Sequence, residues 1–178
     1  MSSKTRAVLA RLLALAFVIA ISVTIFLYRD QAEQLARYGY PGIFLFSLRA
    51  YATVLMPAPG IAVVFSMGGV INPFGVALAA GAGAALGELS GYLIGYSSQI
   101  VAERSELYQR LVGWMRSNGA LAVFVLSAIP NPLFDVAGAA AGSLKMPYPK
   151  FLLWCWLGQT LKMLVIALLG ERFFKLLP

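Results

Sequence analysis

The stretch Ile129-Pro130-Asn131-Pro132-Leu133-Phe134-Asp135-Val136-Ala137-Gly138 decides how the rest of the chain is interpreted. It sets two prolines and one carboxylate inside an otherwise apolar run. In a bilayer every unsatisfied backbone group costs several kcal/mol, so a continuous membrane helix would not carry this sequence. Interrupted backbone is tolerated at membrane depth where protein or a watery cavity satisfies it. The stretch therefore predicts a re-entrant helical hairpin, which enters the bilayer and turns back.

The composition of the whole chain indicates an integral membrane protein. Of the 178 residues, 60% are hydrophobic and 12% are charged, and the mean hydropathy is +0.80. Soluble domains carry about 25% charged residues. Because apolar segments occupy most of the chain, we expect one membrane domain and no soluble module.

The net charge of +7 is typical of nucleic-acid binding, but the positions of the basic residues argue against that function. They gather at the ends of apolar segments, where they would meet anionic lipid headgroups. We therefore expect membrane lipids as partners and no nucleic acid. A homo-oligomer is compatible with the sequence, which leaves the oligomeric state open.

Histidine is absent from the chain, and Cys155 is its single cysteine. A zinc site or a histidine-based triad would have no ligands, and an internal disulfide would have no second thiol. We expect no metal, no cofactor and no enzymatic activity.

An N-terminal transmembrane anchor with an interfacial helix is expected over residues 1–37. The apolar run Leu12–Tyr28 is longer than the core of a typical secretory signal, and it passes into Arg29-Asp30 without a small-residue cleavage site. The basic residues before it place the N-terminus in the cytoplasm.

Residues 38–170 are expected to form the membrane domain, followed by a short tail at 171–178. Its predicted elements are a hairpin at 42–71, a helix at 72–98, an amphipathic surface helix at 101–116, a second hairpin at 119–144 and a helix at 147–170. The residues expected to shape the hairpins are Pro57, Pro59, Gly60, Pro130, Pro132 and Gly138. The predicted fold class is all-α, with transmembrane helices and two facing re-entrant hairpins.

Small residues recur at every fourth position along the helix predicted at 72–98. Such a stripe lets another helix approach the backbone closely, so we interpret it as a packing face. The stripe consists of Gly75, Ala79, Gly83, Gly87, Gly91 and Gly95.

The two halves of the membrane domain follow the same plan. The separation from Pro59 to Gly69 equals the separation from Pro132 to Gly142. A proline-initiated helix follows each hairpin. Corresponding interrupted segments in two halves predict an inverted repeat whose breaks meet near the membrane midplane.

The same repeat pairs two charges inside apolar segments. Glu88 follows Pro73 by the same number of positions as Lys162 follows Pro147. Opposite signs at equivalent positions suggest an ion pair across the pseudo-twofold axis, and we hypothesise that the two side chains meet or share a cavity.

Ionisable residues inside membrane segments are rare and often functional. The residues predicted to line a path for lipid headgroups are Arg49, Glu88, Asn131, Asp135 and Lys162. Structural roles remain open for each of them. Asp135 suits a hairpin cap, the Asn131 amide suits freed backbone groups, and Arg49 suits an ion pair with Asp135.

Two stretches resemble the VTT superfamily, also called SNARE-associated Golgi proteins, which includes the bacterial DedA proteins and the vacuole membrane protein branch. Residues 81–88 resemble the family's Gly-Ala-rich helix, and residues 130–138 are similar to the second-loop signature of the vacuole membrane protein branch. The resemblance implies two facing re-entrant hairpins and the movement of lipid between leaflets, with phospholipid scrambling in the eukaryotic branch and polyprenyl-phosphate or phospholipid translocation in DedA proteins.

The chain departs from the DedA pattern at three positions. Ile61 stands where that pattern has a glutamate, and Ala128 and Asp135 stand where it has arginines. These differences favour energy-independent scrambling over proton coupling.

The leading hypothesis is therefore a lipid scramblase or flippase that moves phospholipid or polyprenyl-phosphate between leaflets. The alternatives are an ion-coupled small-solute transporter and a membrane-assembly or interaction protein without transport. We expect a multi-pass protein of a prokaryotic cytoplasmic membrane.

Overall fold

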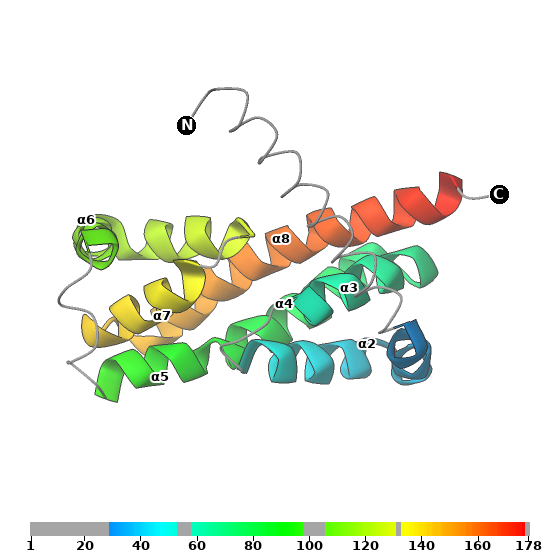
Figure 1. Cartoon of the computed structure of the whole chain (residues 1–178), viewed down its shortest axis with the longest axis horizontal. Helices are drawn as coiled ribbons and strands as arrows, with labels where there is room; N and C mark the ends of the chain where they lie inside the picture. The colour runs from blue at the N-terminus through cyan, green and yellow to red at the C-terminus, as the bar shows by residue number, and fades with distance from the viewer. Residues whose placement is uncertain (1–28, 53–57, 98–105, 131–132, 177–178) are drawn as a thin grey trace, which may run out of the picture.

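The structure of the protein is a computed structural model, which describes residues 29–52, 58–97, 106–130 and 133–176. Within these ranges the chain forms helices and no strands, which confirms the predicted all-α class (Figure 1). The helices are α2 (Arg29–Ala52), α3 (Ala58–Val70), α4 (Pro73–Gly87), α5 (Leu89–Ser97), α6 (Glu106–Ala128), α7 (Leu133–Ser143) and α8 (Tyr148–Leu176). The predicted N-terminal transmembrane helix lies outside the described residues.

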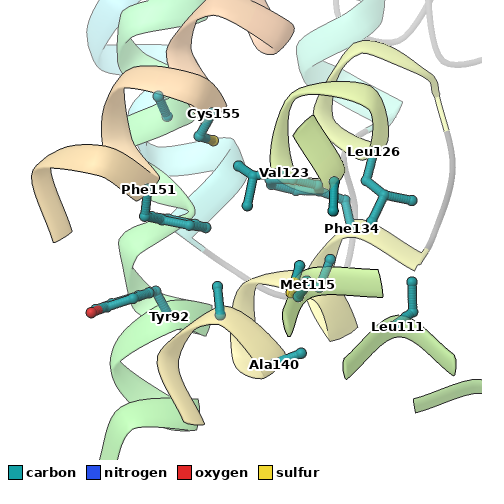
Figure 2. Packing of buried hydrophobic residues seen from close by; sticks show 13 residues of the cluster. Tyr92, Leu111, Met115, Val123, Leu126, Phe134, Ala140, Phe151 and Cys155 are labelled. Atoms are coloured by element: carbon teal, nitrogen blue, oxygen red, sulfur yellow. The ribbon is translucent and has the colours of Figure 1, made fainter. Parts of the chain in front are cut away.

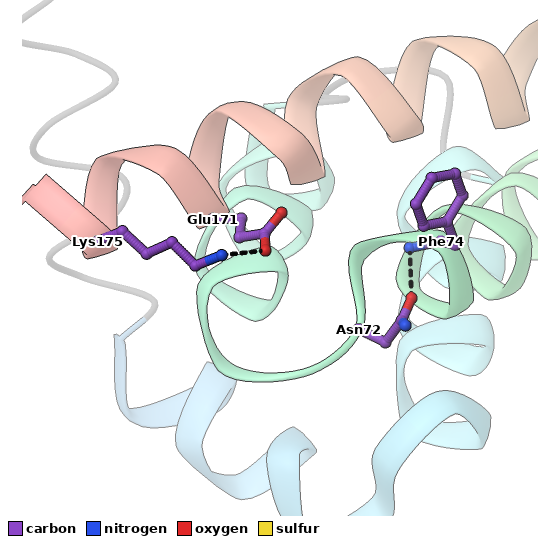
Figure 3. A network of polar contacts seen from close by, with 4 residues as sticks. All are labelled: Asn72, Phe74, Glu171 and Lys175. Carbon is purple, nitrogen blue, oxygen red and sulfur yellow. Dashed lines mark hydrogen bonds and ion pairs between the residues drawn. The ribbon is translucent and has the colours of Figure 1, made fainter.

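In the described part of the chain, three helical stretches are long and apolar enough to cross a membrane: Pro73–Ser97, Gln109–Ala128 and Tyr148–Leu176. The first consists of α4 and α5, and the last is α8. α8 continues to Leu176, beyond the end expected at residue 170. In its last turns Lys175 Nζ lies 2.7 Å from Glu171 Oε1 (Figure 3).

Helices α2 and α6 each contain a kink. Gly39 interrupts α2 with φ 57° and ψ −142°, and Asn118 interrupts α6 with φ −142° and ψ 59°. Positive φ is readily adopted by glycine, which explains the residue type at the first kink. The second kink falls within Ser117-Asn118-Gly119, where the sequence predicts the amphipathic helix to end. Each of these helices therefore consists of two segments with different directions.

Two helix pairs occupy the places of the predicted hairpins. The first helix pair is residues 40–52 with α3, and the second helix pair is residues 119–128 with α7. The helices of each pair pack against each other. A re-entrant course through a bilayer stays a prediction for both pairs.

In each half one helix packs within its own half and another packs against the opposite half. α2 packs on α4, and likewise α6 packs on α8. α3 crosses over to α8, and likewise α7 crosses over to α5. α4 and α8 form the central contact between the halves (Figure 1). This reciprocal pattern is what a pseudo-twofold axis between α4 and α8 produces.

Close glycine contacts repeat in the two halves with the same register. A Cβ on Gly68 would overlap the backbone of Ala167, and a Cβ on Gly142 would overlap the backbone of Tyr92. The sequence separation from Gly68 to Gly142 matches that from Tyr92 to Ala167 to within a single position. The second contact is therefore the counterpart of the first.

Two further pairs of contacts repeat in the two halves, with their glycines 75 positions apart, although the partners Phe44 and Phe124 on α2 and α6 are 80 positions apart. Gly170 lies against the carbonyl group of Phe65, and Gly95 lies against that of Ala139. In addition, Gly83 meets the Phe44 carbonyl, and Gly158 meets the Phe124 carbonyl. Gly83 and Gly95, which belong to the predicted stripe, thus lie on packing contacts with α2 and α7.

This register differs by one residue from the proline-based alignment. The helix caps explain the difference, because the Asn72 carbonyl accepts from Val76 N whereas the Pro147 carbonyl accepts from Phe151 N. Pro73 is therefore the first residue of α4, while Pro147 is the residue before α8. The counterpart of Lys162 in the first half is Gly87, not Glu88.

Asn72 fixes the start of α4. Its side-chain Oδ1 accepts a hydrogen bond from the backbone N–H group of Phe74 at 2.9 Å (Figure 3). It also accepts from that of Gly75 at 3.3 Å. This is the role of an N-cap residue, and Pro73 follows at a position where proline is favoured.

Two hydrophobic clusters form the core, and each contains residues of both halves. Figure 2 shows the cluster around α6 and α7, where the Tyr92 ring of α5 and the Phe151 ring of α8 stack with their centroids 4.9 Å apart. Met115 from the first segment of α6 belongs to the same cluster. The other cluster is built around Ile43, Met67 and Met163.

Candidate functional site

A buried polar contact joins the two central helices. Glu88 is 5% exposed and Gln159 is fully buried. Gln159 Nε2 donates to Glu88 Oε1 over 3.5 Å, which is at the long end of hydrogen-bond distances. A carboxylate in an apolar environment is costly unless it has such partners. The contact therefore holds a charge where α4 and α5 meet α8.

Glu88 lies at the junction of α4 and α5, where the backbone stays helical. It follows the last residue of α4 and precedes the first residue of α5. Its backbone N–H still donates to the Ala84 carbonyl at 2.9 Å, so the chain keeps its direction. Ser90 Oγ lies 2.9 Å from the Gly87 carbonyl and 3.2 Å from the Ala52 carbonyl. The Ser90 hydroxyl thus contacts a carbonyl at the end of α4 and a carbonyl at the end of α2.

Lys162 extends the polar site along α8. It is 8% exposed and lies three residues after Gln159, so the two share one helix face. Lys162 Nζ lies 5.4 Å from the centre of the Tyr51 ring, in cation–π geometry. Cys155 is buried on the same face. Because Gln159 contacts the Glu88 carboxylate, groups of opposite charge type lie on one side of α8.

Both helix pairs reach this site. Tyr51, near the end of α2, brings the first helix pair to Lys162. Gly138 of α7 lies against the backbone of Glu88 and Tyr92, which brings the second helix pair to the helix segment that carries the carboxylate. Each helix pair therefore approaches a charge that belongs to the other half of the molecule.

The site lies about half-way along two candidate spans. Glu88 is an interior residue of the span Pro73–Ser97, and Lys162 is at the centre of the span Tyr148–Leu176. A lone charge at the centre of a membrane helix costs roughly 2.5–3.5 kcal/mol on insertion scales. Polar groups at this depth need partners from protein, water or a ligand.

One hydrogen-bond acceptor of the site, the side-chain oxygen of Gln159, is available to a further donor. Within the described part of the chain, Gln159 Oε1 is buried and has no hydrogen-bond partner. Leaving a buried acceptor unsatisfied costs about 1–3 kcal/mol, so a water molecule or a polar ligand group would be bound favourably there.

Arg49 differs from Glu88 and Lys162 in its burial. It lies in the last turn of α2, and its side chain is exposed. Asp135 is the third residue of α7, but its side chain and the whole of Asn131 lie outside the described residues. The predicted contact between Arg49 and Asp135 stays a prediction.

The hairpin-shaping residues are described in part. Gly60 is buried against the Tyr51 ring in the first turn of α3, and Pro130 is exposed before α7. Pro59 follows the first residue of α3, while Pro57 and Pro132 lie outside the described residues.

Gln159 and Tyr51 belong to the site but are not among the residues predicted from the sequence. Gln159 has a recognisable signal, because an amide three residues before Lys162 in a long apolar helix is a second polar group on one face. Tyr51 has no such signal, since its role depends on the packing of α2 near α8.

Comparison with known proteins identifies the family. Residues 58–172 match the VTT domain family, a range that contains Glu88, Gln159 and Lys162. The chain belongs to this family. It is 33% identical over 140 residues to an uncharacterized membrane protein of Synechocystis sp., which corresponds to 70% of this chain and 63% of that protein. The chain thus spans less than two thirds of this relative's length. No solved structure matches the chain in this comparison.

The family and the relative confirm the predicted resemblance and the location in a membrane. The VTT domain begins at the start of α3 and ends within α8, so it excludes Tyr51 and the rest of α2. The polar residues of the two central helices therefore belong to the family domain, and the contact made by Tyr51 is added from outside it.

Proposed function

We propose that this VTT-domain protein moves phospholipid or polyprenyl-phosphate between the two leaflets of a membrane without an energy source. The observation that carries the proposal is the buried contact between Gln159 and Glu88, with Lys162 on the same face of α8. These groups lie about half-way along two candidate spans.

The chemistry of this site suits a lipid headgroup. A phospholipid must carry its polar headgroup through an apolar core, and this transfer is the barrier to spontaneous movement. Lys162 offers a cation for the phosphate group, and Glu88 offers an anion for a cationic headgroup such as ethanolamine. Because the two charges are opposite, a zwitterionic headgroup can exchange with contacts that the protein already makes.

The backbone around the site supports the same function. Both helix pairs contact the site, since Tyr51 lies against Lys162 and Gly138 lies against the backbone of Glu88. Corresponding segments of two halves that meet at membrane depth are typical of transport sites, where they line a polar path. The acyl chains would stay in the bilayer while the headgroup passes along this path.

The same proposal includes a non-enzymatic role in the cytoplasmic membrane of a prokaryote, with membrane lipids as the partners. Arg49, Asn131 and Asp135 would extend the path toward the ends of the helix pairs. Both a monomer and a homo-oligomer are compatible with this role.

The test is a leaflet-exchange assay with the purified full-length protein in vesicles. A headgroup-labelled fluorescent phospholipid is bleached from outside with dithionite, without nucleotide or ion gradient. Bleaching of the inner-leaflet label as well as the outer-leaflet label is expected. Movement that requires a proton or sodium gradient would instead indicate an ion-coupled carrier. Protection equal to that in protein-free vesicles would leave a role in membrane assembly.

A further inference from the structure

A cavity of about 570 Å³ lies beside the kink of α6, in the second half of the molecule. Its walls come from both segments of α6, from the end of α7 and from the first turns of α8. Arg116 and Lys150 both line it, and Trp154 lies beside them. Among the described residues that line it, none is acidic.

The two cations are available to a ligand. Both side chains are exposed, and within the described ranges neither forms an ion pair with a carboxylate. Arg116 presents a guanidinium fork that matches phosphate oxygens, and Lys150 adds a second positive charge across the cavity. The rest of the wall is largely apolar, with Leu121, Leu144 and Met146.

The first half of the molecule closes the equivalent place. In the register fixed by the glycine contacts, Ala120 corresponds to Tyr40 and Lys150 corresponds to Gly75. The Tyr40 ring lies so close to Gly75 that a Cβ there would overlap it. In the second half both counterparts line the cavity instead. In the first half the Tyr40 ring therefore fills this space. In the second half the methyl group of Ala120 stands in place of the ring, and Lys150 stands in place of Gly75, which leaves the cavity open.

We propose that this cavity binds a phosphate ester anion, such as the headgroup of an anionic phospholipid. The kink supports such a ligand, because the segment after Asn118 begins at the cavity, where Gly119 and Ala120 line the wall, and the positive end of a helix dipole favours an anion. The apolar wall would contact the glycerol and the first methylene groups. This inference concerns binding at a second place and is independent of lipid movement through the buried polar site.

The test is calorimetric titration of the full-length protein in a non-ionic detergent with dihexanoyl phosphatidylglycerol. Binding is expected for the wild-type protein. Because each charge-assisted hydrogen bond contributes substantially, the double variant Arg116→Gln/Lys150→Gln should bind about tenfold more weakly or worse. Arg110→Gln is the matched control, since it removes a charge from an exposed position of α6 outside the cavity. Its affinity should equal that of the wild-type protein.

A second variant tests whether binding requires the open volume of the cavity, with its two cations left in place. Ala120→Tyr restores the ring that fills the equivalent place in the first half, and it should abolish binding while both cations remain. Thermal unfolding of every variant checks that the fold is intact. Titration with glycerol 3-phosphate separates the two sources of the anion. Tighter binding of the lipid assigns a headgroup, and equal affinity assigns a soluble phosphate ester.

Two results would overturn the proposal. One is the absence of binding to the wild-type protein by both ligands. The other is an unchanged affinity in both the double variant and Ala120→Tyr.

Discussion

Gln159 Nε2 donates a hydrogen bond to Glu88 Oε1 between residues that are 71 positions apart in the chain. The bond joins the junction of α4 and α5 in the first half to the middle of α8 in the second half. It connects the two central helices directly through their side chains, so a change at either residue should be felt in both halves.

Replacing Gln159 by Glu changes the charge of the site and almost nothing of its shape. The variant would place a second carboxylate beside Glu88 in a buried position, where two like charges cannot both ionise easily. We expect the free energy of unfolding to fall by about 2 kcal/mol or more, and Gln159→Leu to cost less. Chemical unfolding in detergent, followed by tryptophan fluorescence, measures the difference. Equal stability of the wild-type protein and Gln159→Glu would show that the contact is absent in solution.

Replacing Lys162 by Met removes the cation and keeps the length of the side chain. The variant loses the interaction with the Tyr51 ring, which is worth about 0.5–2 kcal/mol, and the proposed contact with the lipid phosphate. We expect lipid exchange in vesicles to slow at least several-fold. Lys175→Met is the control on the same helix, because Lys175 is exposed and pairs with Glu171 near the end of α8. If both variants slow exchange equally, the effect belongs to the charge of α8 and not to the buried site.

The close glycine contacts predict matched costs in the two halves. Gly95→Val and Gly170→Val would each drive a side chain into the backbone of a crossing helix, at Ala139 and Phe65 respectively. We expect each to destabilise the protein by about 1–3 kcal/mol or more. Gly113→Ala is the control, since a Cβ at Gly113 meets no atom within 4 Å. A large loss in one half and none in the other would argue against the pseudo-twofold packing.

Asp135 is a candidate from the sequence alone. It is the third residue of α7, where a carboxylate is favourable for the start of a helix and is also close to the predicted hairpin tip. We expect Asp135→Asn to slow lipid exchange severalfold while the protein stays folded, with only a small decrease in the midpoint of thermal unfolding. Unchanged exchange would reduce Asp135 to a structural cap.

The sequence predicts the helical architecture because a backbone inside the bilayer must satisfy all its hydrogen bonds internally, and few structures do so. Proline and glycine positions mark the breaks well, as Ser117-Asn118-Gly119 shows by coinciding with the kink of α6. The repeat is also visible from proline spacing. The alignment that pairs Pro73 with Pro147 is wrong by one residue. A proline can be the first residue of a helix or the residue before it, and the two cases differ in which carbonyl accepts the first helical hydrogen bond.

The site is predicted less completely than the fold. Glu88 and Lys162 stand out because charges are rare in apolar segments, and the structure buries both. Arg49 stands out for the same reason, yet its side chain is exposed, since the face that a residue occupies depends on how α2 packs. The cavity at Arg116 and Lys150 has no signal in the sequence. The cavity exists because Ala120 has a small side chain where its counterpart in the first half, Tyr40, has a ring. This difference is recognised only when the structure shows that the two residues occupy equivalent positions.

The rate of lipid exchange in vesicles that hold equal amounts of wild-type protein or Glu88→Gln/Lys162→Met tests the central claim most directly. Both samples are compared with protein-free vesicles, without nucleotide or ion gradient. We expect rapid bleaching of the inner-leaflet label with the wild-type protein and a strongly reduced rate with the folded double variant. Equal rates in the wild-type protein and the folded double variant, or no exchange by the wild-type protein, would contradict it.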